Sequence, residues 1–180
     1  MTTTHNFKDS LEKSKAQESA TFWEPVYRQA FPGFSQMMSV RCDGWAQRGG
    51  IDRVVLLSSG KSINIDEKVR YKSYGDIILE RWSSREKKTP GWIQKNLATD
   101  YIAYAFVPDR RCYLLPFIQL RAAWVKCGRG WIDDAENNRN GFKVVLAKNP
   151  GYTTESIAIP IPELMAEMHR ASVITWSEGL

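Results

Sequence analysis

Two runs rich in strand-forming residues at the centre of the chain predict a β-hairpin. The first run covers residues 51–57 and the second covers residues 62–70, and a short polar stretch with Gly60 joins them. Both runs contain several β-branched residues, and a glycine-containing connection of this length is typical of a hairpin. Because side chains alternate between the two faces of a strand, we expect Asp66 and Lys68 to share one face.

Helical and extended patterns follow one another along the rest of the chain. Apolar residues at helical spacing predict a helix from Thr21 that ends at Pro32-Gly33, and Thr21 with Glu24 has the form of a capping box. Further elements are expected as a third meander strand at 76–82, a loop at 83–91, a helical turn at 92–95, a buried strand at 101–107, a strand at 112–115, a helix from Pro116 to about Lys126, a loop at 127–141, strands at 142–146 and 156–159, and a helix at 162–168.

Together these elements predict a mixed α/β or α+β fold over residues 18–180, with a three-stranded meander in a central mixed sheet flanked by helices. Residues 1–17 are polar with little periodicity, and we expect a flexible arm there. A length of 180 residues with 43% hydrophobic residues is compatible with one domain and a substantial core.

The cysteines and the N-terminal segment favour a cytoplasmic protein. Cys42, Cys112 and Cys127 are far apart and lack CxxC or Cys/His metal spacing, so free thiols are expected. No apolar run approaches the ~20 residues that span a bilayer. The N-terminus lacks the layout of a secretory signal, and we expect no membrane partner.

The net charge of +5 and the sequence pI of about 9.1 favour a polyanionic partner such as DNA. Residues 81–95 form a short span that is both basic and aromatic. A solvated loop is the alternative interpretation of its charges. The candidate DNA-binding residues are Arg70 on the second hairpin strand and, in this span, Arg81, Arg85, Lys87, Lys88 and Trp92.

Asp52, Asp66 and Lys68 carry the clearest chemistry in the sequence. The hairpin folds the chain back, so Asp52 near the start of one strand is expected close to Asp66 near the end of the next. Two carboxylates and one ammonium on a sheet surface are expensive to bury without a ligand. Mg²⁺ prefers a few carboxylates together with water and phosphate oxygens. A solvated ion-pair ladder is the alternative.

The arrangement Gly50-Ile51-Asp52, about a dozen residues, and then Ile65-Asp66-Glu67-Lys68 resembles the core of the PD-(D/E)XK nuclease superfamily, the restriction-endonuclease-like fold. In that family a helix precedes a three-stranded meander, and a helix and a further strand follow it. The resemblance implies that Asp52 and Asp66 hold the metal, that Lys68 assists the attacking water, and that the backbone carbonyl of Glu67 completes the metal shell. The Pro of the motif is absent, since Ile51 precedes Asp52.

Two further residues are candidates through the same resemblance. Glu24 corresponds to the helix-borne acidic ligand that many members add, with Glu18 as a second candidate, and the capping box is the competing explanation for Glu24. Gln47 lies upstream of the Gly50-Ile51-Asp52 turn and could contact a water or a phosphate, whereas an ordinary loop amide is the alternative.

We therefore expect a nuclease that uses Mg²⁺ or Mn²⁺ to hydrolyse DNA. Its compact form suits a phage or prophage setting by association, and double-strand cutters with one site per chain generally work as homodimers. The alternatives are a non-catalytic binding module on the same fold, such as an inhibitor or adaptor, and an RNA-directed nuclease. With only two histidines and no GxxxxGK[ST] loop, a His-activated nucleophile or a nucleotide-driven motor is unsupported.

Overall fold

The computed structural model describes residues 21–177, so the predicted arm at 1–17 and the candidate Glu18 lie outside the described residues. The described chain divides into two compact units, each built from segments far apart in the sequence. The hairpin unit contains residues 21–73, 96–118 and 170–177, and the second unit contains residues 74–95 and 119–169. The two units interleave along the chain, and the single domain expected over 18–180 remains a prediction.

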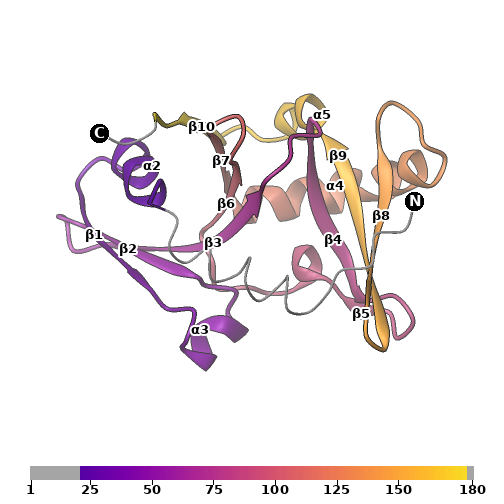
Figure 1. Cartoon of the computed structure of the whole chain (residues 1–180), viewed down its shortest axis with the longest axis horizontal. Coiled ribbons are helices and arrows are strands. Elements are labelled where there is room, and N and C mark those ends of the chain that lie inside the picture. Colours follow the sequence, from indigo (N-terminus) through magenta and orange to yellow (C-terminus); the bar gives the residue numbers. More distant parts are fainter. Residues whose placement is uncertain (1–20, 178–180) are drawn as a thin grey trace. The chain divides into compact units, whose positions relative to one another are not determined.

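The hairpin unit is built on a six-stranded mixed sheet in the order β1-β2-β3-β6-β7-β10 (Figure 1). Its first three strands form an antiparallel meander, β6 runs parallel to β3, and β7 and β10 complete the sheet with antiparallel pairings. The predicted hairpin is confirmed as the β2–β3 pair. The strand bounds are β1 (Phe34–Ser39), β2 (Arg53–Leu57), β3 (Ser62–Arg70), β6 (Tyr101–Phe106), β7 (Arg111–Pro116) and β10 (Ser172–Thr175).

The strands that form the meander differ from the prediction. The strand expected at 76–82 exists as β4 (Asp76–Ser84), but it pairs in the sheet of the second unit. Its place in the meander is taken by β1, which the sequence did not reveal. Most of β1 is exposed and its burial does not alternate, so it lacks the period-two pattern that marks a half-buried strand. A five-residue helix, α3 (Gly44–Arg48), follows β1 and was also missed.

Helix α2 (Trp23–Ala30) packs on one face of this sheet and confirms the helix predicted from Thr21. The capping box is wrong, because the helix has no side-chain cap hydrogen bond. The buried core on this face comprises Trp23, Val26, Tyr27 and Phe31 with the strand residues Val55, Ile65, Ala103, Ala105, Cys112, Leu114 and Ile174. Since Ile65 faces this core, Asp66 faces the other side of the sheet.

The second unit contains a four-stranded antiparallel sheet in the order β5-β4-β9-β8. Both units combine helices with a sheet, which confirms the mixed α+β class. The three cysteines are free thiols, and no described helix is long and apolar enough to cross a membrane. The remaining elements are β5 (Thr89–Pro90), η1 (Trp92–Gln94), α4 (Phe117–Glu136, of which 117–118 belong to the hairpin unit), β8 (Lys143–Asn149), β9 (Tyr152–Pro160) and α5 (Ile161–Ala166).

Two predicted loops are shorter than expected. The helix opened by Pro116 continues to Glu136, because burial of Trp131 and Ala135 outweighs the low helix propensity of the glycines that suggested a loop. The segment 83–91 is mostly the end of β4, a tight turn and β5. The other predicted elements are confirmed as η1, β6, β7, β8, β9 and α5.

Gly91 lies so close to β4 that it cannot carry a side chain. A Cβ at this position would be 2.1 Å from the backbone oxygen of Glu80, whereas one at Gly130 in α4 would meet nothing within 4 Å. We expect Gly91→Ala to lower the free energy of unfolding by about 2 kcal/mol or more, because backbone must shift. Gly130→Ala should raise it by about 0.5–1 kcal/mol. Urea unfolding followed by circular dichroism measures both, and equal stabilities would contradict the close approach.

Candidate functional site

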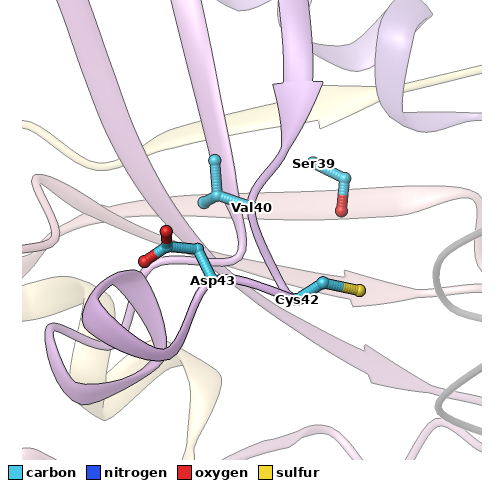
Figure 2. Close-up of a pocket in the computed structure, with 4 residues that line it drawn as sticks. All are labelled: Ser39, Val40, Cys42 and Asp43. Carbon is cyan, nitrogen blue, oxygen red and sulfur yellow. The ribbon is translucent and has the colours of Figure 1, made fainter.

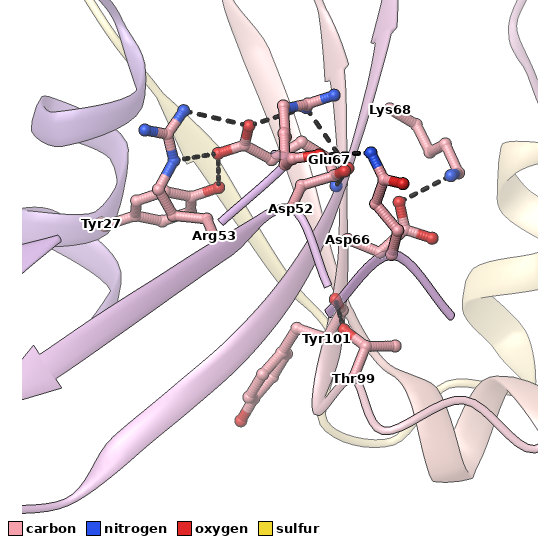
Figure 3. Close-up of polar contacts among 10 residues, drawn as sticks. Tyr27, Asp52, Arg53, Asp66, Glu67, Lys68, Thr99 and Tyr101 are labelled. Carbon is pink, nitrogen blue, oxygen red and sulfur yellow. Dashed lines mark hydrogen bonds and ion pairs between the residues drawn. The ribbon is translucent and has the colours of Figure 1, made fainter. Parts of the chain in front are cut away.

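The β2–β3 hairpin holds Asp52 beside the Asp66-Glu67-Lys68 run. The Asp52 N–H donates to the Ile65 carbonyl at 2.9 Å, and Asp52 Oδ2 accepts from the Glu67 N–H at 2.9 Å. Lys68 Nζ donates to Asp66 Oδ1 at 2.6 Å (Figure 3). The structure therefore brings together the three residues that the sequence singled out.

Asp66 is held where its charge is unfavourable. Its side chain is only 6% exposed, against 33% for Lys68. Burial raises the pKa of the Asp66 carboxyl to about 6, the Lys68 ammonium opposes that rise, and the Asp52 carboxylate adds to it. Asp66 is paired with the Lys68 ammonium and Asp52 with the Arg41 guanidinium, and an added cation would relieve the remaining repulsion between the two carboxylates.

The backbone before Asp52 is fixed by a glycine. Gly50 has a φ of +69°, and a Cβ there would lie 2.9 Å from the Leu97 side chain. An L side chain would be strained in this left-handed conformation. Just after the turn, the Asp52 carbonyl accepts from the Val40 N–H at 3.0 Å. The chain thus enters β2 along a path that determines where the Asp52 carboxylate lies.

The Glu67 side chain points away from Asp66, toward helix α2, where it is fully buried. Its Oε1 accepts from the Tyr27 hydroxyl at 2.8 Å and from Arg53 Nε at 2.9 Å. Its Oε2 accepts from Arg53 Nη2 at 3.1 Å and from Arg41 Nη2 at 3.0 Å (Figure 3). The Glu67 carboxylate is therefore part of a buried ion-pair network and faces away from the Asp66 side of the sheet.

The polar backbone groups of Glu67 face a different direction from its side chain. The N–H and C=O of one strand residue point toward the same neighbouring strand. Since the Glu67 N–H donates to Asp52, the Glu67 carbonyl also faces the Asp52 side. This carbonyl is the group that the family resemblance implies as a metal ligand.

Arg41 is the site residue that sequence reasoning missed. Its Nη2 lies 3.3 Å from Asp52 Oδ2 and 3.0 Å from Glu67 Oε2, and its side chain is 12% exposed. Arg41 therefore connects the buried network to the carboxylate of Asp52. It lies in the loop between β1 and α3, outside any motif, so no local signal in the sequence marks it.

Glu24 and Gln47 have other partners. Glu24 pairs with Arg28 at 2.6 Å on the exposed side of α2, and the Gln47 side-chain amide donates to the Arg41 carbonyl. Within residues 21–177, no three His, Cys, Asp or Glu side chains are grouped as a metal site. The carboxylates of Asp52 and Asp66 thus form a pair that neither Glu24 nor the Glu67 carboxylate joins.

The expected DNA-binding residues are divided between the two units. Arg70 follows Asp66 and Lys68 by alternation along β3, and its Nη1 donates to the Tyr104 hydroxyl at 3.1 Å. The others lie in the second unit. There Arg81 and Arg85 pair with the buried Glu155 at 3.1 and 2.9 Å, Lys87 and Lys88 are exposed between β4 and β5, and the Trp92 N–H donates to Glu80 at 3.2 Å.

No family model, curated protein or solved structure matches this chain. The interpretation of the site therefore depends on its residues and their geometry.

The Glu67 network should dominate the stability of the hairpin unit. Glu67→Gln preserves shape but leaves the buried Arg53 without its ion-pair partner and Arg41 with Asp52 alone, so we expect the free energy of unfolding to fall by about 3–5 kcal/mol. Tyr27→Phe removes one hydrogen bond and should lower it by about 1 kcal/mol. Glu24→Gln, at an exposed pair, is the control with a change below about 0.5 kcal/mol. Urea unfolding distinguishes this order from three equal effects, which would contradict the network.

Asp66 should make stability pH-dependent when a chelator removes divalent metal. Its folded-state pKa of about 6 lies above the unfolded value of about 3.9, so between these values the folded state binds more protons. Stability then falls as pH rises through this window. Relative to Asp66→Asn, which does not titrate, the wild type should lose about 2–3 kcal/mol. Urea unfolding of both proteins across the window measures this, and parallel pH curves would contradict the shift.

Proposed function

We propose that this protein is a Mg²⁺- or Mn²⁺-dependent nuclease of the restriction-endonuclease-like, PD-(D/E)XK type that hydrolyses DNA phosphodiester bonds. The observation that carries the proposal is the convergence of Asp52 with Asp66 and Lys68 across the β2–β3 hairpin, with Lys68 Nζ 2.6 Å from Asp66 Oδ1. A surface ion-pair ladder does not account for this group, because Asp66 is buried and its pKa is raised.

The donor set fits a hard divalent cation. Mg²⁺ is commonly bound through one or two carboxylates plus water and substrate phosphates, which is what Asp52 and Asp66 could provide. The Glu67 carbonyl, which faces the Asp52 side, would add a neutral oxygen. The raised pKa of Asp66 also fits, because a nearby cation would favour its ionised form.

A divalent cation held there would polarise a phosphoryl oxygen and lower the pKa of a bound water. The residues of the chain have separate tasks around it. The Lys68 ammonium lies at the partly exposed edge of the site, where it can orient the attacking water and stabilise charge developing on the phosphate. Arg41 and the Glu67 N–H both contact Asp52 Oδ2 and so fix the orientation of that carboxylate.

The order of elements supports the same assignment. Helix α2 precedes three antiparallel strands, Asp52 immediately precedes the second strand, and Asp66-Glu67-Lys68 lies on the third. A further strand, β6, then pairs in parallel with β3. One feature departs from the family pattern: the described chain between β3 and β6 contains β4, β5 and the short η1 in place of an α-helix.

Substitution of the site should abolish cleavage without unfolding the protein. We expect Asp52→Asn and Lys68→Met each to lower the rate of Mg²⁺-dependent DNA cleavage by about a hundredfold or more. Asp52→Asn should also weaken Mn²⁺ binding in calorimetry, whereas Lys68→Met should retain it, because the amine is not a ligand. Circular dichroism verifies that both variants are folded.

Two matched controls use exposed residues of the same unit. Glu24→Gln removes an acidic group paired on the surface of α2, and Lys61→Met removes a lysine from the hairpin turn. Both should cleave at the wild-type rate. Undiminished cleavage by Asp52→Asn and Lys68→Met would refute the proposed site, and Mn²⁺ binding without cleavage by the wild type would favour a non-catalytic binding module.

A further inference from the structure

Trp45 on helix α3 is the one exposed tryptophan in the described part of the chain, which includes all seven tryptophans of the sequence. The residue is 70% exposed. Within residues 21–177 its indole makes no aromatic or cation–π contact. A large apolar ring in this position has no structural role in the core of the hairpin unit.

The backbone that carries this ring is nevertheless tightly held. Asp43 Oδ1 accepts from the N–H groups of Trp45 and Ala46, both at 2.8 Å. The Trp45 carbonyl accepts from the Gly49 N–H at 3.1 Å, and the Ala46 carbonyl accepts from the Ile51 N–H at 2.9 Å. A helix of five residues is too short to be stable alone, so these contacts maintain it. Because this backbone is already ordered, a ligand that stacks on the ring costs only the rotamer freedom of the Trp45 side chain.

The surroundings of Trp45 suit a nucleotide. Arg48 is exposed three residues later, so both side chains lie on one side of α3. A guanidinium is well suited to a phosphate oxygen. The segment that leads into α3 lines an open hollow of about 490 Å³, formed by Ser39, Val40, Cys42 and Asp43 (Figure 2). The Asp43 carboxylate there is engaged by two N–H donors, which offset its charge.

Backbone contacts also connect α3 and the segment before it to the backbone of Ile51 and Asp52. The Val40 N–H donates to the Asp52 carbonyl at 3.0 Å on one side of α3, and the Ile51 N–H donates to Ala46 on the other. Trp45 is next to Ala46 in the sequence and Asp52 is next to Ile51, so this contact places the backbone of α3 beside the segment that carries Asp52.

We infer that Trp45 stacks on an unpaired base of the substrate while Arg48 contacts the adjacent phosphate backbone. This inference rests on the proposed function and assigns its substrate class: single-stranded DNA, or DNA with unpaired bases at the cleavage point. Every base has a π-face, so stacking tolerates any sequence. In an intact duplex both faces are covered by neighbouring base pairs, and exposing one requires unstacking.

Binding can be measured without cleavage. Fluorescence anisotropy would compare a labelled oligothymidine of about 16 nucleotides with a blunt duplex of equal length. Every protein in this comparison carries Asp52→Asn, and divalent metal is omitted. Adding Trp45→Ala should weaken single-strand binding by about five- to a hundredfold and change duplex binding little, and Trp45→Phe should recover most of the loss. Adding Arg48→Ala should weaken both and lower the salt slope by about one.

Tyr152→Ala, at a 43% exposed aromatic residue in the second unit, is the matched control and should leave binding unchanged. Unchanged single-strand binding by Trp45→Ala would overturn the inference, as would equal losses on single strand and duplex or failure of the parent to bind the single strand. The proposed function fails by a different result, namely undiminished cleavage after Asp52→Asn and Lys68→Met, so the two failures are distinguishable.

Discussion

The buried carboxylate of Glu67 is the interaction on which the hairpin unit depends. It accepts hydrogen bonds from Tyr27 on α2, from Arg53 on β2 and from Arg41 in the loop before α3. Three parts of the chain therefore converge on one charged group, which could not be buried without them. Because Arg41 also contacts Asp52, the same network that holds the helix on the sheet sets the position of a candidate metal ligand.

Strand β3 separates structural and chemical roles between its two faces. Ile65 and Glu67 face α2, where one packs in the core and the other completes the ion-pair network. Asp66 and Lys68 face the opposite side, where burial raises the pKa of the Asp66 carboxyl although the Lys68 ammonium lies close to it. A shift of register by one residue would exchange these roles, so the buried network also protects the register of the site.

The basic residues of the chain are divided between paired and exposed positions, which composition does not reveal. In the second unit Arg81 and Arg85 neutralise the buried Glu155, so part of the basic segment there has a structural task. In the hairpin unit, Arg48 and Trp45 are exposed on the helix that precedes Asp52. A run of basic residues in the sequence therefore does not show which of its charges are already paired within the fold.

The sequence by itself determined the local elements with strong periodicity and the residues that the β2–β3 hairpin brings together. Asp52, Asp66 and Lys68 could be identified because strand alternation and hairpin closure are short-range properties of the chain. Only the tertiary structure decided that β1 completes the meander and that β4 joins another sheet, since pairing partners depend on long-range packing. The partners of Glu67 and the role of Arg41 likewise required the fold, because the burial of a charge depends on residues distant in sequence that come to surround it.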